Sequence, residues 1–327
     1  SNGVSAISKS SKASDWSTSR FKRLQYVMSK GPSLILAVSP DVSAAIQSYS
    51  PRSGRLSVKK ETKAAVSNRA ASAAVVSITP DVANQILKNS GNTYEGLKSA
   101  IDNSGKPQTQ SLKSQISMNY GPVNKDVKSV NVLGYLEGSD LKDELVVYSA
   151  HYDHIGLTTD GGADKVNNGA DDDGSGTTGV LSIARAYAKA KKAGHGPRRS
   201  VLFLLVTGEE KGLLGSEYYA SNPVFPMANT ITNLNIDMIG RTGELYKNDA
   251  DSTNYCYLIG SDKLSTDLHK ISENANAVYT RMKIDYKYND PNDPERIYYR
   301  SDHYNFAKNG VPIVFYFNGV HEDYHKA

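Results

Sequence analysis

Beyond residue 110, short apolar runs alternate with segments that contain few helix-breaking residues. The residues expected in strands are 130–136, 144–150, 200–207, 231–238, 255–260 and 312–317, and those expected in helices are 175–193, 213–221, 264–274 and 302–308. The run at 200–207 is almost continuously apolar, which is typical of a strand buried on both faces. The alternation predicts an α/β fold with a mostly parallel mixed sheet and helices on both faces.

The N-terminal part repeats one local pattern. The apolar run 34–38 leads into Ser39-Pro40-Asp41, and the run 75–78 leads into Thr79-Pro80-Asp81. Each is a short strand followed by a Ser or Thr N-cap, a proline at the first helical position and an acid in the first turn. The pattern predicts a small α/β module, with a polar loop at 50–67 between the two units.

The segment 89–110 is polar and contains Gly91, Gly105 and Pro107, so we predict the domain boundary there. Residues 1–110 would form an accessory segment and residues 111–327 the second, larger domain. Every histidine lies after Ala150, and residues 1–110 contain neither His nor Cys. Chemistry that needs an imidazole is therefore expected in the larger domain.

Charge and composition exclude several classes of function. The chain has 38 Lys and Arg against 34 Asp and Glu, and residues 1–110 alone hold 15 basic against 6 acidic residues. These basic residues are scattered among Ser and Ala, so we expect a solvated surface and no nucleic-acid partner. No apolar stretch approaches the ~20 residues of a membrane span. The single cysteine, Cys256, excludes an internal disulfide and a cysteine-based zinc site.

The sequence contains few signals for the cellular location of the protein. The chain starts at Ser1 without an initiator Met or a recognisable signal peptide, as a processed product would. We expect a secreted or periplasmic protein. The oligomeric state stays open.

Polar residues with metal-binding side chains follow the predicted strands. Their positions are 151–154 (His-Tyr-Asp-His), 209–210 (Glu-Glu), 237 (Asp) and 321–325 (His-Glu-Asp-Tyr-His), with Asp171-Asp172-Asp173 before the longest predicted helix. In open α/β sheets, ligands bind beyond the carboxyl ends of the strands. Imidazole and carboxylate groups suit zinc or a similar divalent ion, so the pattern predicts a metal centre at this edge.

Five motifs in this part of the chain resemble those of the M28-family zinc exopeptidases, which include aminopeptidases and glutamate carboxypeptidases. The resemblance covers about residues 130–325, and its motifs lie at 149–153, 168–176, 208–216, 235–238 and 324–325. It implies a zinc-exopeptidase-like fold, a peptide substrate and two Zn²⁺ ions, with Mn²⁺ or Co²⁺ as alternatives.

The resemblance also implies a role for each matching residue. Asp172 would bridge the two ions, with His151 and Asp237 completing one position and Glu210 and His325 the other. Asp153 would orient the His151 imidazole. Glu209 would be the general base, and Tyr324 would donate a hydrogen bond to the oxyanion. A cis peptide bond is implied between Asp172 and Asp173.

Three other functions remain open. His321-Glu322-x-x-His325 fits the H-E-x-x-H motif of zincin proteases, but that motif requires a helix. A glutaminyl-cyclase-like enzyme would use one zinc ion, whereas the five implied ligands favour two. A receptor ectodomain of the same fold would be non-catalytic, and Glu209 beside a complete ligand set argues against this alternative.

Two further expectations concern specificity and the accessory segment. No basic cluster stands out to hold a substrate carboxylate, so removal of N-terminal residues is favoured over carboxypeptidase activity. Residues 1–110 resemble part of a protease-associated domain. Ser301-Asp302-His303 is expected to cap a helix near the site, and Arg241 to form a structural salt bridge.

Overall fold

The computed structural model describes residues 15, 19–44, 56–58, 73–118, 125–158 and 162–327. The chain divides into two compact units, one of Ser1–Gly54 with Glu61–Lys125 and one of Arg55–Lys60 with Asp126–Ala327. The predicted boundary at residue 110 lies 16 residues before Asp126, where the second unit resumes. None of the described helices is long and apolar enough to cross a membrane.

The first unit contains a two-stranded parallel sheet of β1 (Leu34–Val38) and β2 (Ala74–Ile78). The predicted strand-to-helix pattern is confirmed after β2, where Thr79 caps α4 (Pro80–Leu87) by accepting a hydrogen bond from the backbone N–H of Val82. After β1, helical backbone begins at residue 42, and its continuation and most of the predicted loop at 50–67 lie outside the described residues. Helix α2 (Arg20–Met28) was not predicted.

Within the segment 89–110, where we predict the domain boundary, helix α5 (Tyr94–Ser104) was not predicted. Thr93 caps the start of α5, and Gly105 ends it in the left-handed conformation at φ 65°. Tyr94, Leu97 and Ile101 give one side of this segment an apolar stripe at helical spacing. The glycines that suggested a loop are therefore helix ends.

The second unit is built on a seven-stranded sheet in the order β10-β9-β11-β8-β4-β7-β3. Neighbours are parallel except for the pairs β11–β9 and β3–β7, so the predicted mostly parallel mixed sheet is confirmed. The strands are β3 (Val132–Leu136), β4 (Leu141–His151), β7 (Arg199–Val206), β8 (Thr230–Ile236), β9 (Tyr255–Ile259), β10 (Lys283–Asp285) and β11 (Ile313–Phe317). The short pair β5 (Gly156–Leu157) and β6 (Val166–Asn167) follows β4 outside this sheet.

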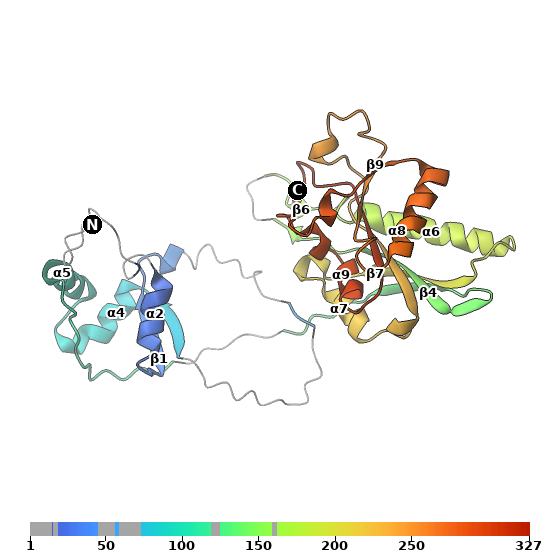
Figure 1. The fold of residues 1–327 in the computed structure, drawn as a ribbon. Coiled ribbons are helices and arrows are strands. Elements are labelled where there is room, and N and C mark those ends of the chain that lie inside the picture. Colours follow the sequence, from blue (N-terminus) through green and yellow to red (C-terminus); the bar gives the residue numbers. More distant parts are fainter. Residues whose placement is uncertain (1–14, 16–18, 45–55, 59–72, 119–124, 159–161) are drawn as a thin grey trace. The chain divides into compact units, whose positions relative to one another are not determined.

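Helices cover both faces of the sheet, as predicted (Figure 1). They are α6 (Gly174–Lys192), α7 (Leu214–Ser221), α8 (Thr266–Ala275) and α9 (His303–Ala307). Successive residues of β7 point to opposite faces. Val201 and Phe203 pack with Val180 of α6, whereas Leu202 and Leu204 pack with α7 and α9. This alternation explains why β7 is apolar from Val201 to Val206.

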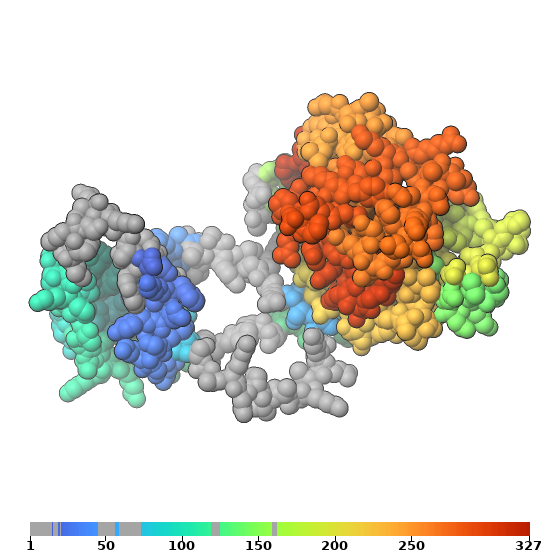
Figure 2. All heavy atoms as spheres, in the orientation of Figure 1, coloured from blue at the N-terminus to red at the C-terminus, as the bar shows by residue number. Residues whose placement is uncertain are grey.

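Short helical turns fill several loops of the two units. They are η1 (Lys88–Ser90), η2 (Glu209–Lys211), η3 (Met227–Asn229), η4 (Glu244–Tyr246), η5 (Asn276–Thr280), η6 (Lys287–Asn289) and η7 (Ile297–Tyr299). In the space-filling view, the orange and red segments that include α8 and α9 form much of the visible face of the second unit (Figure 2).

Strand direction decides where the polar residues meet. β4, β7, β8 and β11 all run the same way, since β4 is parallel to β7 and β8, and β11 is parallel to β8. Their carboxyl ends therefore share one edge of the sheet. The segments that follow these four strands are those in which the sequence places its imidazoles and carboxylates.

Candidate metal centre

The residue at the middle of the acidic triplet, Asp172, contacts two histidines from distant parts of the chain. Its Oδ1 lies 3.0 Å from Nε2 of His151, and its Oδ2 lies 3.1 Å from Nε2 of His325. Burial alone would raise the pKa of Asp172, but the two imidazoles outweigh burial and hold it well below its usual range. The carboxylate of Asp172 therefore has one oxygen on each side of the centre.

The flanking acids of the triplet have other partners. Asp173 accepts hydrogen bonds from three backbone amides, those of His151, Gly176 and Met238. Asp171 accepts a hydrogen bond from the backbone of Gly240, and its other oxygen lies 3.1 Å from Nε2 of His321. A side chain at position 176 would collide with Asp173, since a Cβ there would lie 2.3 Å from its Oδ1. Asp173 thus starts α6, and the peptide bond between Asp172 and Asp173 is cis, as expected.

His151 and Asp237 form the first half of the centre. Nε2 of His151 is 3.8 Å from Oδ2 of Asp237, at the carboxyl ends of β4 and β8. Both side chains are buried, and burial raises the pKa of Asp237 to about 6. A carboxylate in such surroundings needs a cation or a proton.

A chain of buried hydrogen bonds holds Asp237 in place. Ser301 donates from Oγ to Asp237 Oδ2 at 2.6 Å and accepts from the side-chain amide of Asn235 at 2.8 Å. The side-chain oxygen of Asn235, Oδ1, in turn accepts a hydrogen bond from the Ser149 hydroxyl at 2.6 Å. The expectation that Ser301-Asp302-His303 caps a helix is wrong in this respect, since α9 has no side-chain cap from Asp302. Ser301 instead fixes the orientation of Asp237.

Glu210 and His325 form the second half of the centre. Nε2 of His325 lies 3.3 Å from Oε1 of Glu210, in addition to its contact with Asp172. The Glu210 side chain is 7% exposed, whereas His325 is 35% exposed. The contacts that tether the segment carrying His325 include the His321–Asp171 contact and a 2.9 Å salt bridge between Arg241 and Asp323. The predicted structural role of Arg241 is confirmed.

The five ligands that the sequence predicts therefore meet at one sheet edge. His151, Asp172, Glu210, Asp237 and His325 are linked by imidazole–carboxylate distances of 3.0 to 3.8 Å.

Glu209 lies beside this cluster. Its Oε2 is 3.9 Å from Nε2 of His151, and its backbone N–H donates to Oδ1 of Asp153 at 3.1 Å. Burial raises the pKa of Glu209 well above its usual value despite the nearby His151, with repulsion from Asp302 adding to the rise. A carboxyl group with a raised pKa is suited to accept and return a proton near neutral pH.

Asp153 contacts His151 mainly through its backbone. Nδ1 of His151 lies 3.0 Å from the carbonyl oxygen of Asp153, whereas the Asp153 carboxylate is 3.8 Å away. The predicted orienting residue is therefore adjacent to the imidazole, but its carboxylate mainly positions the backbone of Glu209.

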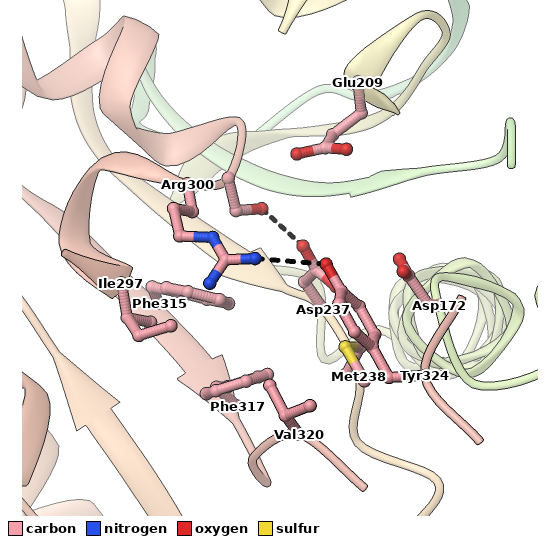
Figure 3. A pocket seen from close by; sticks show the side chains of 11 residues that line it. Asp172, Glu209, Asp237, Met238, Ile297, Arg300, Phe315, Phe317, Val320 and Tyr324 are labelled. Atoms are coloured by element: carbon pink, nitrogen blue, oxygen red, sulfur yellow. Dashed lines mark hydrogen bonds between the residues drawn. The ribbon is translucent and has the colours of Figure 1, made fainter. Parts of the chain in front are cut away.

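Tyr324 and Arg300 face a pocket next to the carboxylates (Figure 3). Arg300 donates from Nη2 to the Tyr324 hydroxyl at 3.2 Å, and burial raises the pKa of Tyr324 to about 12. The phenol therefore keeps its proton at neutral pH. The apolar part of the pocket lining consists of Met238, Ile297, Phe315, Phe317 and Val320.

The H-E-x-x-H alternative is excluded by the backbone. Residues 321–325 form turns rather than a helix, and Glu322 pairs with Lys247 at 3.0 Å on the surface. His321 contacts Asp171, whereas His325 contacts Asp172 and Glu210. The two histidines therefore do not share a set of ligands.

Sequence reasoning missed two residues of the site. His154 was part of the motif at 151–154 without a role, and its Nδ1 lies 2.8 Å from Oε1 of Glu210. Arg300 had no signal, since it contacts Tyr324 only because η7 and the chain's last segment lie side by side. A position at the end of a strand could have indicated His154, but not Arg300.

The residues at the centre fit a divalent cation. Among the described residues, the buried atoms His151 Nε2 and Glu210 Oε1 make no hydrogen bond of good geometry, although an oppositely charged group lies close to each. Among the described residues, two groups of side chains have ligand atoms within 4.8 Å of one another, close enough to hold a cation: His151, Asp173 and Asp237, and His154, Asp172 and Glu210. Imidazole nitrogens and carboxylate oxygens are the donors that zinc prefers when cysteine is absent.

Comparisons with known proteins point to one family. The model of peptidase family M28 matches residues 131–327. The chain is similar to the aminopeptidase YwaD of Bacillus subtilis, with 30% identity over 152 residues, 42% of this chain and 30% of that protein. It is also similar to a vacuolar membrane protease of Tuber melanosporum, with 30% identity over 132 residues, 39% of this chain and 13% of that protein. The matches thus span less than a third of these relatives.

The chain is also similar to two solved structures. A zinc aminopeptidase from Bacillus subtilis aligns with a TM-score of 0.45 and 22% identity, covering 60% of this chain and 43% of that one. LapB from Legionella pneumophila aligns with a TM-score of 0.46 and 20% identity, covering 60% and 48%. Because the family model matches more than half of the sequence, and its match contains all five residues predicted as ligands, this chain belongs to peptidase family M28.

Proposed function

We propose that the second unit is a zinc-dependent exopeptidase that holds two cations and removes N-terminal residues from peptides. The observation that carries this proposal is the placement of Asp172, whose two oxygens face His151 on one side and His325 on the other at 3.0 and 3.1 Å. A carboxylate that faces two separate imidazoles can serve as a shared ligand. His151 and Asp237 would complete the first position, and Glu210 and His325 the second.

Bound cations would polarise the scissile carbonyl and lower the pKa of water at the site. Glu209 is next to the cluster, and its raised pKa suits it to take a proton from that water and deliver it to the leaving amine. Tyr324 keeps its phenolic proton and can donate it in a hydrogen bond to the oxyanion. Arg300, bonded to the same hydroxyl, would hold the phenol in position.

The pocket supports an aminopeptidase rather than a carboxypeptidase. Among the described residues that line it, three are carboxylates (Asp172, Glu209 and Asp237), and Arg300 is the one cationic side chain. Such a lining favours a positively charged amino terminus over a carboxylate. The apolar wall would accept an apolar first residue of the substrate. We further propose that the first unit is an accessory module without catalytic residues.

A substrate panel combined with metal analysis tests this proposal. Zinc-loaded protein should contain two ions per chain and hydrolyse aminoacyl anilides faster than peptides with a blocked amino terminus. One ion per chain together with cyclisation of N-terminal glutamine peptides would instead indicate a glutaminyl-cyclase-like enzyme. Absence of turnover, unchanged by Glu209→Gln, would indicate a binding module. Preference for free C-terminal residues would overturn the aminopeptidase assignment.

A further inference from the structure

His154 is a second histidine, besides His325, that contacts the second half of the centre. It lies between β4 and β5, three residues beyond His151. Its Nδ1 is 2.8 Å from Glu210 Oε1 and 3.8 Å from Asp172 Oδ2. These are the same two oxygens that His325 Nε2 approaches at 3.3 and 3.1 Å. Two imidazoles therefore face one pair of carboxylates.

The two histidines differ in how firmly the fold holds them. The side chain of His154 is only 10% exposed, against 35% for His325. Nδ1 of His154 is fully buried and, among the described residues, makes no hydrogen bond of good geometry, and the same is true of Glu210 Oε1. Burying a polar nitrogen without a partner is unfavourable. A cation between these two atoms would remove that penalty for both.

The surroundings of His154 are shaped to its ring. A Cβ at Gly169 would lie 2.6 Å from His154 Cγ and 2.5 Å from the carbonyl oxygen of Asp172, and Gly169 has a φ of +65°. Any other residue there would push the imidazole away from Asp172. The His154 ring also packs edge-on against the ring of His325, with centroids 5.5 Å apart. The packing keeps Nδ1 directed at the carboxylates.

We propose that His154 is a further nitrogen ligand of the second cation, beside Asp172 and Glu210. The proposal rests on the two-cation centre of the proposed function. One imidazole and two carboxylates form a donor set suited to zinc. The second position would therefore keep three protein ligands even without His325, and the buried histidine would anchor the ion.

The test is a titration of the metal-free full chain with Zn²⁺ in competition with a chromophoric chelator. For His154→Ala and His154→Gln, we expect the affinity for the second ion to fall at least ~10-fold while that for the first stays unchanged. His325→Ala should weaken the second ion without abolishing its binding, and the double variant His154→Ala/His325→Ala should bind one ion. His195→Ala, at an exposed turn, is the matched control.

A second readout is the visible absorption of the Co²⁺-loaded protein, which reports the ligands directly. The absorption bands that appear with the second equivalent of Co²⁺ should change in His154→Gln. This variant keeps much of the side-chain volume beside Gly169 and so serves as the test if the alanine variant fails to fold. Two ions with wild-type affinities and an unchanged Co²⁺ spectrum in His154→Gln would overturn the role of His154 alone. Uptake of fewer than two ions by the wild type would overturn the two-cation centre and this inference with it.

Discussion

The two halves of the centre share Asp172 but are constructed differently. The first half, His151 and Asp237, lies on the ends of two neighbouring central strands and is fixed by a buried hydrogen-bond chain through Ser301. The second half, Glu210 and His325, lies on a short helical turn and on a terminal segment, where His325 is 35% exposed. The sheet therefore preorganises one half, whereas loop contacts hold the other.

This difference predicts unequal behaviour of the two positions. The first should be insensitive to changes in residues 321–325, and the second should respond to any change that loosens them. The shared carboxylate is the exception, since both positions depend on it.

Loss of Asp172 should have the largest effect. In Asp172→Ala, both halves lose their common ligand, so we expect binding of both ions to weaken more than ~100-fold, beyond the loss typical of an outer partner. Peptidase activity should fall to background. Metal titration and an aminoacyl anilide assay measure the two effects, with exposed Asp267→Asn as the control. Retention of one tightly bound ion would show that Asp172 is not shared.

Replacement of Glu209 should separate catalysis from metal binding. In Glu209→Gln, we expect kcat to fall ~10²- to 10⁴-fold because no general base remains, while both ions bind as in the wild type. The control is Glu322→Gln, which changes the glutamate of the H-E-x-x-H sequence on the surface. If Glu322→Gln were the damaging variant, the assignment of the base would be wrong.

Removal of the Ser301 hydroxyl should affect the first half alone. Ser301→Ala deletes the 2.6 Å hydrogen bond to Asp237, so we expect the affinity for the first ion to fall ~10- to 100-fold. The second ion should be unaffected. Stepwise Zn²⁺ titration measures both constants, and Ser301→Thr, which keeps the hydroxyl, should restore much of the loss. An equal loss at both positions would contradict the independence of the two halves.

Loosening of the terminal segment should affect the second half, with the smallest effect. His321→Ala removes the buried contact with Asp171, leaving the Arg241–Asp323 and Lys247–Glu322 salt bridges and the Arg300–Tyr324 hydrogen bond to hold the segment. We expect the second ion to bind a few-fold more weakly, since exposed salt bridges are weak tethers. His269→Ala, on helix α8, is the control. A loss of affinity for the first ion instead would contradict the assignment of residues 321–325 to the second half.

Much of the fold was predictable because its signals are local. The apolar run at β7, the N-cap and proline at Thr79-Pro80 and the acidic start of α6 each act within a few residues. Where local signals are ambiguous, the prediction failed. Gly91 and Gly105 are equally compatible with a loop and with helix ends, and only the helix α5 between them decides.

The candidate site divides in the same way. The sequence by itself placed imidazoles and carboxylates after β4, β7, β8 and β11, and parallel strands bring such positions to one edge. It also determined the family, because the motifs keep their order along the chain. The resemblance implied a role for Asp172, but the sequence could not assign partners to Asp171 and Asp173 beside it.

Tertiary structure alone decided those partners and the remaining contacts. Ser301 reaches Asp237 across 64 residues, and Asp153 reaches the backbone of Glu209 across 56. His154 meets Glu210 only because the β4 and β7 loops lie at neighbouring strand ends. Contacts of this range depend on strand order and loop path, which arise from the packing of the whole unit. The sequence therefore determined which metal-binding side chains are present, and the fold determined which of their atoms lie in contact.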